Sequence, residues 1–488
     1  MTLYNKNDNL IFKFSLISML IFSSMGVQAQ SISYSEAEQN YLRDSYSSQA
    51  NQALQQSTQL EAEAIQGIAL PRVDLNVRAY AFHNKVDLPL DGFKNNLEQT
   101  LSQSINDKIN SQNLPNTIAD PLKDGLSQAI HSGIGLFPDS SNVVLEDQVI
   151  RPTVSVMMPL YTGGLTTSAK QAANLKAQRS QLNTTQQQDV QRFELIQAYF
   201  NVQLQQKLLA SSRYNARAMQ QHYDNALKIE KQGFISKGQR MQFEVAKNDA
   251  ERLVQNSDAN LRSSLFKLNN LLQSSQITDL TTPLFVNQQQ SQDLNALLAS
   301  FSQQSSLIGK MQLDTELAKT NVKVQSAAKK PNVFAFGEYS LDEQQNWIVG
   351  VAARYSLFSG IDKNKNVQAA ELQRYASELL TERTKQEIET LIYTAFNEMN
   401  SAQQSHRLLQ NNIKAAQESV RIQQLSFQED MGTAMQVIDA QNRLSALNSE
   451  IALNAYKYVM SLATLLQSHG SIAQFQNYLT QANTDYIR

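Results

Sequence analysis

The sequence predicts a mixed helix-and-strand protein built from two similar units, each with two short strands followed by one long helical hairpin. Glycine and proline are scarce, at 16 and 9 of 488 residues, and such a shortage of interrupting residues favours long regular elements. Two proline-free spans, 165–272 and 361–469, carry apolar residues at helical spacing. Four short segments alternate apolar and polar residues, which is typical of strands.

Each proline-free span is predicted to fold as a helical hairpin. The only glycines between positions 165 and 272 are Gly233 and Gly238, and the only one between 361 and 469 is Gly432. Because glycine interrupts helices, we expect the hairpin turns at these positions. We expect each arm to hold about 68 residues, as 165–233 does, which gives ~100 Å of helix at about 1.5 Å per residue.

Four strands are expected, over residues 72–82, 153–161, 332–341 and 347–358. In the first, Val73, Leu75 and Val77 alternate with polar residues, whereas Phe334 and Phe336 interrupt the alternation of the third. A sheet with one apolar face fits either the half-buried sheet of a soluble protein or the lipid-facing strands of a barrel. The strand pattern alone leaves both alternatives open.

The N-terminus is predicted to be a secretory signal peptide over residues 1–29. Two lysines precede an apolar run over 14–22, and a small-residue cleavage site ends at Ala29. This run is too short for a bilayer core, which needs about 20 residues. The mature chain is expected to begin at Gln30 and to be exported. It has no other long apolar run, so any membrane contact must be made by β-strands.

Export and strand-mediated membrane contact favour the barrel alternative. Trp347 and Tyr355 lie at opposite ends of the fourth predicted strand, as the residues of an aromatic girdle lie at the two membrane interfaces. Four strands cannot close a barrel, and a sheet in a membrane leaves no open edge. Several chains must then share one barrel, so this alternative also predicts an oligomer.

A constant offset relates the two units, which indicates an internal duplication. Tyr161 and Phe358, at the ends of equivalent strands, are 197 positions apart, and so are Gln239 and Gln436 at the predicted hairpin tips. The predicted division of the mature chain is a first repeat over 30–282, a second repeat over 283–469 and a C-terminal equatorial tail over 470–488.

Composition excludes several classes of function. A net charge of −2 lacks the basic excess of nucleic acid binders. The absence of cysteine excludes disulfides, thiolate catalysis, cysteine-ligated zinc and a lipid anchor on an N-terminal cysteine. The five histidines lie far apart without metal-ligand spacing, and we expect them to be solvated or interfacial. No nucleophile elbow, phosphate loop or pair of carboxylates appears, so we expect neither an enzyme nor a bound cofactor.

Two motifs carry a resemblance to a known family. The second strand ends in Pro159-Leu160-Tyr161-Thr162-Gly163-Gly164. The second tip has the sequence Gly432-Thr433-Ala434-Met435-Gln436-Val437-Ile438-Asp439-Ala440-Gln441, and the first tip, 233–244, is a looser copy. With the duplicated layout, these motifs make the chain similar to the TolC-like outer membrane efflux and secretion channels.

The resemblance implies a homotrimer whose twelve-stranded transmembrane β-barrel, four strands per chain, is continued by a long α-helical barrel across the periplasm. Such channels lie in the lipid of the cell outer membrane and perform no chemistry. They receive substrate from an inner-membrane transporter, proton-driven or of the ABC type, through a periplasmic adaptor protein. We therefore expect a passive export duct for drugs, toxic small molecules or other substrates.

Two alternatives to that function stay open. One is the outer membrane component of a type I protein secretion system. The other, from a different class, is a secreted structural coiled-coil protein, which predicts heptad repeats and no lipid-facing strands.

The resemblance also implies a periplasmic gate near the hairpin tips. In a trimer, Asp439 would form a ring of three carboxylates able to select cations; the alternative is a solvated carboxylate near a helix start. Gln436 stands where a second aspartate often lies in the family, and Gln239 is its counterpart in the first repeat. Any ring of charge at the gate would therefore be weaker here.

The tips also present apolar residues beside a tight turn, where an adaptor is expected to dock. The predicted docking residues are Gly233, Phe234, Ile235, Ser236, Met431, Gly432 and Thr433. Alternatively, Phe234 and Met431 pack between neighbouring hairpins. Nearby, Lys237, Arg240 and Arg443 are candidates for inter-hairpin salt bridges, which are individually weak when exposed.

An insertion distinguishes the first unit from the second. From the proline before the first strand to the aromatic residue that ends the second there are 90 positions (71 to 161) in the first unit but 27 (331 to 358) in the second. The extra 63 residues fall in the loop at about 83–147, which is extracellular on the family topology and has helical periodicity at Leu97, Leu101 and Ile105. We expect either a small helical cap at the outer mouth or a segment folded into the lumen.

Overall fold

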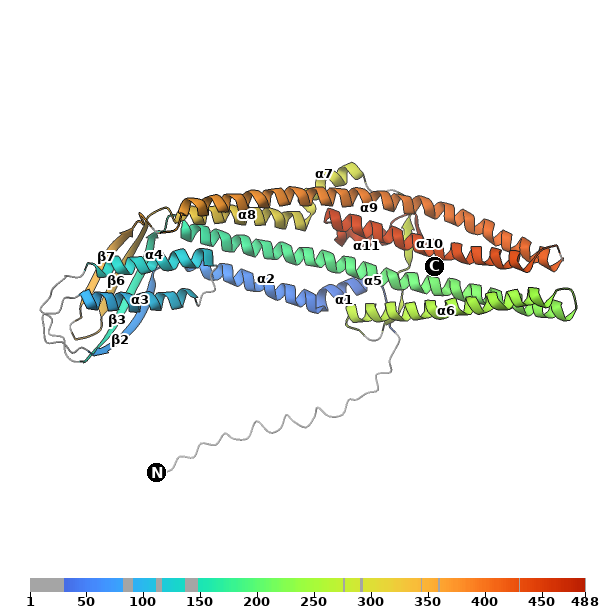
Figure 1. Cartoon of the computed structure of the whole chain (residues 1–488), viewed down its shortest axis with the longest axis horizontal. Coiled ribbons are helices and arrows are strands. Elements are labelled where there is room, and N and C mark those ends of the chain that lie inside the picture. The colour runs from blue at the N-terminus through green and yellow to red at the C-terminus, as the bar shows by residue number, and fades with distance from the viewer. Residues whose placement is uncertain are drawn as a thin grey trace, which may run out of the picture.

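The computed structural model describes residues 30–81, 91–110, 116–136, 148–274, 277–289, 293–343, 345–358, 360–429 and 431–487. The predicted signal peptide at 1–29 lies outside the described residues. Figure 1 shows an elongated molecule with a β-sheet at one end, two helical hairpin tips at the other, and long helices between them.

Two helices run along most of this body. α5 (Leu165–Lys231) has 67 residues and α9 (Lys363–Gln428) has 66, so each is ~100 Å long at about 1.5 Å per residue. Their hairpin partners, α6 (Lys237–Leu271) and α10 (Ala434–His469), have only 35 and 36 residues. The prediction of equally long arms is therefore wrong for the second arms, because the tip glycines lie well past the middle of each span.

Shorter helices cover the half of each long helix that its second arm does not reach. α1 (Tyr34–Asp44) and α2 (Tyr46–Ala64), followed by the 3-10 turn η1 (Ile65–Gly67), lie along α5. Similarly, α7 (Leu294–Gln304) and α8 (Ser306–Ala327) lie along α9. The helices form one layer, in the order α2, α5, α8, α9 near the sheet and α6, α5, α10, α9 near the tips (Figure 1). Among the described residues, no helix combines the length and the apolar character needed to cross a bilayer.

The helix caps follow the duplication. Ser236 and Thr433, 197 positions apart, cap α6 and α10 in the same way. Ser45 and Ser305 cap α2 and α8 and are 260 positions apart. The offset thus changes by 63 between these two pairs of caps, which is the length of the insertion.

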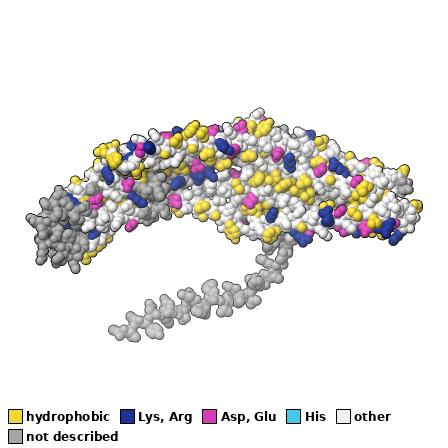
Figure 2. Space-filling model, viewed as in Figure 1, with side chains coloured by type: hydrophobic (Ala, Val, Ile, Leu, Met, Phe, Trp, Pro, Cys, Tyr) yellow, Lys and Arg dark blue, Asp and Glu magenta, His cyan; other side chains and the backbone are white. Residues whose placement is uncertain are grey.

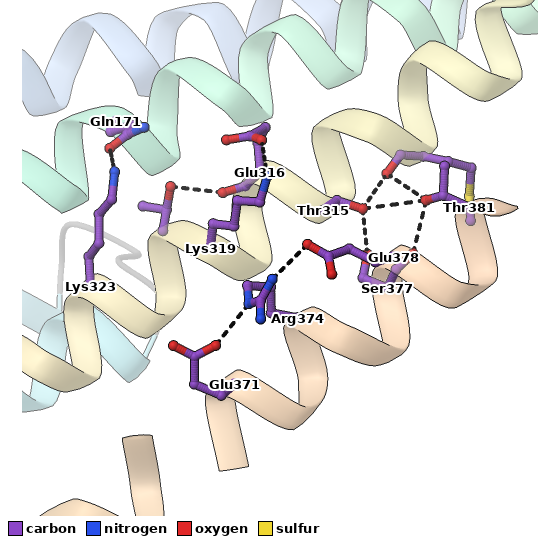
Figure 3. A network of polar contacts seen from close by, with 12 residues as sticks. Gln171, Thr315, Glu316, Lys319, Lys323, Glu371, Arg374, Ser377, Glu378 and Thr381 are labelled. Carbon is purple, nitrogen blue, oxygen red and sulfur yellow. Dashed lines mark hydrogen bonds and ion pairs between the residues drawn. The ribbon is translucent and has the colours of Figure 1, made fainter. Parts of the chain in front are cut away.

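Polar contacts help to hold α8 between α5 and α9 (Figure 3). Thr315 Oγ1 on α8 lies 3.1 Å from Ser377 Oγ and 3.4 Å from Thr381 Oγ1 on α9. On the other side of α8, Lys323 Nζ donates a hydrogen bond to Gln171 Oε1 of α5 at 3.2 Å. The contacts with α9 use short hydroxyl side chains, and the contact with α5 joins a lysine to an amide.

The main hydrophobic core lies at the waist of the molecule. There β1 (Gln30–Ile32) pairs in parallel with β4 (Ile277–Leu280), and β5 (Leu284–Asn287) pairs antiparallel with β8 (Thr484–Ile487). The turn η2 (Ile472–Gln474) and the short α11 (Phe475–Leu479) pack beside them. Both repeats and the C-terminal segment therefore contribute to one core.

An aromatic cluster fills this core. Tyr34, Tyr199, Phe200, Phe285 and Phe475 are each at most 1% exposed. The centroids of contacting rings lie 5.3 to 6.0 Å apart, mostly in edge-to-face geometry, which is a preferred arrangement of aromatic pairs. The cluster joins α1, α5, β5 and α11, and Phe285 also contacts Tyr458 of α10, so both long hairpins meet at this core.

At the end opposite the tips, four antiparallel strands form one sheet in the order β2, β3, β6, β7. The strands are β2 (Arg72–Ala81), β3 (Gln148–Tyr161), β6 (Asn332–Ser340) and β7 (Trp347–Arg354). β3 begins before the predicted position 153 because its first residues pair with the end of β2. β7 ends at Arg354 instead of 358, because Arg354 pairs with Asn332, the first residue of β6.

The insertion forms a helical hairpin that lies against one face of the sheet. It consists of α3 (Asp91–Asn110) and α4 (Asn116–Ile134). A Cβ placed on Gly125 of α4 would lie 3.5 Å from the side chains of Asn332 and Phe334, and one on Gly133 would lie 3.5 Å from the Phe336 ring. The described part of the insertion therefore does not project beyond the sheet as a cap; it is folded back over it (Figure 1).

We predict that Gly470 tolerates alanine far less well than Gly233. Both have positive φ, +89° and +82°, where a side chain costs roughly 1–2 kcal/mol. A Cβ on Gly470 would also lie 2.4 Å from the Gln304 carbonyl oxygen, whereas nothing lies within 4 Å of one on Gly233. Gly470→Ala should thus lower the melting temperature, followed by circular dichroism at 222 nm in detergent, much more than Gly233→Ala. Equal shifts would contradict the packing of α10 against the α7–α8 junction.

Candidate functional site

One face of the sheet is apolar and exposed. Leu75, Val349 and Trp347 expose 67%, 69% and 71% of their surface. The large apolar side chains exposed on this face are Val73, Leu75, Val77, Ile150, Val156, Leu160, Tyr339, Trp347, Val349 and Val351. They come from all four strands and lie side by side in the register, as Val73 beside Val156 does. A contiguous apolar surface of this kind marks a membrane or protein interaction site.

The opposite face of the sheet is polar and carries paired charges. Arg78 lies 3.5 Å from Glu338, and Arg151 lies 2.8 Å from Asp342. Asn76 Nδ2 donates a hydrogen bond to Ser155 Oγ at 3.0 Å. The sheet therefore has one apolar and one polar face, as the alternating sequence predicts.

Phe334 and Phe336 are the exceptions that blurred the pattern of β6. Both point to the polar face, where the α3–α4 hairpin covers them through Gly125 and Gly133. Their aromatic character is thus explained by a helix packed on that face. The sequence of β6 alone does not identify the partner.

Trp347 and Tyr355, the two residues predicted to form an aromatic girdle, lie at opposite ends of β7. Trp347 begins β7, and Tyr355 follows its last residue. Both are exposed, by 71% and 59%. Trp347 also pairs across the sheet with Tyr339, which adds a second aromatic ring on the same exposed face.

The first hairpin tip is a tight turn between α5 and α6. Gly233 adopts φ +82°, a conformation that favours glycine. Phe234 is 72% exposed, while Ile235 packs against the small core shared by the two hairpins. Ser236 Oγ accepts a hydrogen bond from Gln239 N–H at 3.2 Å and so begins α6.

The second tip repeats this arrangement. Met431 is 78% exposed, and its N–H donates to the Ser426 carbonyl at 2.8 Å. Gly432 is in a tight space, since a Cβ there would lie 3.2 Å from the Phe427 nitrogen. Thr433 Oγ1 accepts a hydrogen bond from Gln436 N–H at 3.3 Å.

The side chains of Gln239 and Gln436 complete capping boxes at the two tips. Gln239 Oε1 accepts from Ser236 N–H at 2.9 Å, and Gln436 Oε1 accepts from Thr433 N–H at 2.7 Å. Reciprocal bonds of this kind satisfy the free amides of a helix start. Both glutamines are therefore engaged in fixing the tips, which the sequence interpretation of them as gate residues did not foresee.

Asp439 lies on the exposed side of α10, one turn inside the second tip. In the part of the chain that the structure describes, it forms neither an ion pair nor a hydrogen bond. Its neighbours Val437 and Ile438 point the other way, into the core shared by the hairpins. The carboxylate is thus held on a rigid helix and faces solvent in the single chain.

The two hairpins meet between α5 and α10. Near the tips, Phe243 and Phe427 stack edge-to-face with centroids 5.4 Å apart. Farther along, Ser211 Oγ donates to the Ser445 carbonyl at 3.1 Å, and Asn215 Nδ2 donates to Asn442 Oδ1 at 3.3 Å. This ladder of uncharged contacts joins the repeats close to the tips.

The basic residues near the tips do not link the hairpins as expected. Arg240 pairs with Glu230 at 2.8 Å and with Glu244, both in its own hairpin. Arg443 lies 4.0 Å from Glu450 on the same helix. Lys237 forms no ion pair with any of the described residues. Within one chain, therefore, hydroxyl, amide and aromatic contacts connect the hairpins, because the acidic partners of Arg240 lie closer within its own hairpin.

A groove between α6 and α10 was not predicted. It encloses about 890 Å³ and is lined by Met241, Val245, Leu253 and Met435, which are 45% to 61% exposed. The sequence feature that could have predicted this groove is a second apolar stripe on α6, which lies on a different side of the helix from the buried Phe243 and Ala250. Together with Phe234 and Met431, it gives the tip region a substantial apolar surface.

The expectation that the histidines are solvated or interfacial is wrong for two of them. His406 is 1% exposed and lies 2.8 Å from Asp485 Oδ2, and His469 is 9% exposed and contacts Ser300 and Ser471. Burial lowers the pKa of His469, and likewise that of His222 at the tip half of α5. His83 lies outside the described residues. No group of three or more metal-ligating side chains occurs in the described ranges.

Comparison with known proteins finds a family match over part of the chain. Residues 297–471 match the model of the Outer membrane efflux protein family. The outer membrane protein TolC of Vibrio cholerae serotype O1 is 21% identical over 237 residues, an alignment that covers 46% of this chain and 54% of TolC. The chain thus spans about half the length of the curated relative that it matches.

Solved structures share the fold over most of the chain. The outer membrane protein VceC of Vibrio cholerae superposes with a TM-score of 0.71 at 13% identity, covering 90% of this chain and 96% of VceC. The CmeC outer membrane channel of Campylobacter jejuni gives a TM-score of 0.70 at 11% identity, covering 90% and 86%. At such low identities the likeness establishes the fold.

The long helical body, the terminal four-stranded sheet and these superpositions give the chain the fold of the outer membrane channels. More particularly, residues 297–471 match the outer membrane efflux protein family, and the chain is similar to TolC over about half of its length, in agreement with the resemblance found in its sequence.

Proposed function

We propose that three copies of this chain form a passive export duct in the cell outer membrane. The observation that carries the proposal is the exposed apolar face of the sheet, which suits contact with lipid. β2, β6 and β7 have 10, 9 and 8 residues, close to the roughly 9–11 residues of a membrane-spanning strand. β2 and β7 are the edge strands through which neighbouring chains would pair, so that twelve strands close one barrel without a free edge.

The helical layer would continue that barrel into the periplasm. Its long helices, ~100 Å each, extend from the sheet to the tips, so the tips would lie far from the outer membrane. In Figure 2, basic and acidic side chains are interspersed along this body. A mixed, mostly uncharged polar surface suits a water-filled duct whose cargo should not bind tightly.

We assign the periplasmic gate to the region of Asp439. Three copies of this exposed carboxylate on a three-fold axis would form a ring that attracts cations. Gln239 and Gln436 belong to the gate as the residues that fix the helix starts, through their capping boxes. The aromatic girdle of Trp347 and Tyr355 would mark the two membrane interfaces at the other end.

The adaptor protein would dock at the tips. Phe234 and Met431 are highly exposed apolar residues on rigid turns, supported by Gly233, Ile235, Ser236, Gly432 and Thr433. The apolar groove between α6 and α10 begins beside them, which suits a helical partner laid along the hairpins.

The substrate is proposed from the family. An outer membrane efflux protein domain over residues 297–471 favours export of drugs or toxic small molecules supplied by an inner-membrane transporter. A type I protein secretion system would use the same duct with an ABC transporter. The two systems can be distinguished by cross-linking the hairpin tips to their partners in cells. Mass spectrometry of the proteins recovered with this chain would then identify the adaptor and the transporter.

We predict that a charge on the apolar sheet face prevents outer membrane assembly. Val351 is 60% exposed, and arginine at the middle of a lipid-facing strand costs about 2–4 kcal/mol. Val351→Arg should deplete the heat-modifiable trimer from detergent extracts of outer membranes. The control Leu372→Arg changes an equally apolar residue, 67% exposed on α9, and should be recovered normally. Normal recovery of Val351→Arg, or wild-type protein in the soluble periplasmic fraction, would overturn the membrane assignment.

We predict that neutralising Asp439 reduces the cation preference of the open duct. In planar bilayers, Asp439→Asn should lower the ratio of cation to anion permeability several-fold, because the carboxylate ring is removed while helix α10 keeps its cap. Glu389→Gln, at an exposed position midway along α9, is the matched control and should behave like wild type. Identical ion selectivity in wild type and both variants would mean that Asp439 is only a solvated carboxylate near a helix start and does not act on passing ions.

We predict that the exposed apolar tip residues provide much of the binding energy for the adaptor. Burial of a Phe or Met side chain contributes about 1.5–3 kcal/mol, so Phe234→Ser with Met431→Ser should weaken adaptor binding at least about tenfold, measured by pull-down and by sensitivity of cells to exported compounds. Leu453→Ser, on α10 away from the tip and 47% exposed, should leave both unchanged. Wild-type binding by the double variant would instead favour packing of these residues between hairpins.

A further inference from the structure

The insertion between β2 and β3 lies on the polar face of the sheet in the single chain. Both of its connections leave the sheet at the end remote from the long helices, because β2 ends there at Ala81 and β3 begins there at Gln148. Leu122 near the start of α4 nevertheless packs against a small cluster that includes Leu165, at the junction with the helical body. The hairpin therefore runs back along the full height of the sheet.

The contacts between the hairpin and the sheet are made mainly by α4. Gly125 and Gly133 of α4 lie against the side chains of Phe334 and Phe336 on β6, and Phe334 is only 2% exposed. Phe336 in turn lies over Gly350 of β7, where a Cβ would be 3.0 Å from the ring. The hairpin thus covers two aromatic rings that would otherwise be exposed on the polar face.

The hairpin also has a core of its own. α3 contacts mainly α4. The buried residues between the two helices are Leu97, Ile105, Ile109, Ile130 and Ile134, and Met157 of β3 packs at their margin. This cluster is separate from the main core at the waist. Because the two helices bury these apolar side chains mainly against each other, the hairpin can move as one body.

The proposed trimer sets a limit on what the barrel can contain, and this step rests on the proposed function. If the apolar face of the sheet meets lipid, the polar face and the hairpin on it face the lumen. A barrel of twelve strands about 4.8 Å apart and tilted about 40° is roughly 24 Å across between backbones. A helix with its side chains is about 10–12 Å wide, so this lumen holds at most about three helices. Three hairpins of two helices each do not fit.

We infer that the α3–α4 hairpin is an intrachain cover of the sheet, which must leave the polar face before three chains can close a barrel. The single chain keeps Phe334 and Phe336 buried, and closure of the barrel excludes the hairpin from the lumen, so the cover delays assembly. Pairing of the edge strands β2 and β7 with neighbouring chains drives the exchange, because each edge carries a row of unpaired backbone N–H and C=O groups. The displaced hairpin stays attached at the outer end of the sheet, where both of its connections begin.

The absence of native cysteine allows the cover to be locked by a disulfide. A Cβ on Gly125 would lie 3.9 Å from Asn332 Cγ, so Gly125→Cys with Asn332→Cys brings two sulfurs within reach of a bond between α4 and β6. The matched control, Leu182→Cys with Gly309→Cys, joins α5 to α8, which stay together; a Cβ on Gly309 would lie 3.0 Å from Leu182 Cδ1. Both variants are exported to the oxidising periplasm, in cells grown with or without dithiothreitol, and trimers are detected by heat-modifiable migration.

The locked chain should remain a monomer unless it is reduced. The control pair and each single-cysteine variant should form trimers as wild type does, with or without the reductant. A locked chain that assembles normally while oxidised would overturn the cover and leave the trimeric duct intact. If neither wild type nor the reduced variants form a trimer, the proposed function fails, and the inference fails with it.

Two further measurements do not depend on the lock. Gly133 lies against the Phe336 ring in the single chain, so Gly133→Cys should react with a water-soluble maleimide in purified trimers. The control Ala455→Cys, at a position 0% exposed in the core at the waist, should not react. A variant with residues 82–147 replaced by the six-residue connection 341–346 of the second repeat should form trimers several-fold faster after synthesis. Either an unreactive Gly133→Cys trimer or an unchanged rate of assembly would contradict the cover.

Discussion

Helices of 67 and 66 residues must be covered by other helices along their whole length, because a helix surrounded by water gains little stability from propensity alone. The second arms of the hairpins reach only half of that length. α1 and α2 on one side, and α7 and α8 on the other, cover the remainder. The aromatic cluster around Tyr199 and Phe285 then fixes the junction between the two sets. This need for lateral cover explains why the chain places its main core at mid-length and not at either end.

The two tips owe their similarity to the same local chemistry in both repeats. A hydroxyl residue and a glutamine three positions later form a capping box at Ser236 and again at Thr433, so the start of each returning helix is determined locally. The contact between tips is different in kind. It depends on the small apolar core that Phe243 shares with Val437 and Ile438, on the Phe243–Phe427 contact, and on a ladder of Ser and Asn side chains from both hairpins.

The sheet end is organised around two faces of opposite character. The apolar face is complete and faces away from the chain, whereas the polar face is largely covered by the insertion. Such an arrangement is unstable for an isolated soluble chain, since it exposes a contiguous apolar surface, but it suits an environment with lipid on one side. The insertion uses that asymmetry, because its glycines on α4 match Phe334 and Phe336, two aromatic residues that the alternation of β6 places on the polar face.

The sequence by itself determined the duplication, the four strands, the long first arms and the positions of both tips. These features depend on local signals: the scarcity of glycine and proline, the period of two around Val73 and Val77, and the offset of 197 positions. Tertiary structure decided the rest. The insertion's helical periodicity at Leu97 and Ile105 predicts helices but not the surface they cover, because that depends on Gly125, Gly133 and Phe336, which are distant in sequence. Likewise, the partners of Arg240, the burial of His406 and the capping role of Gln436 depend on contacts made only once the chain has folded.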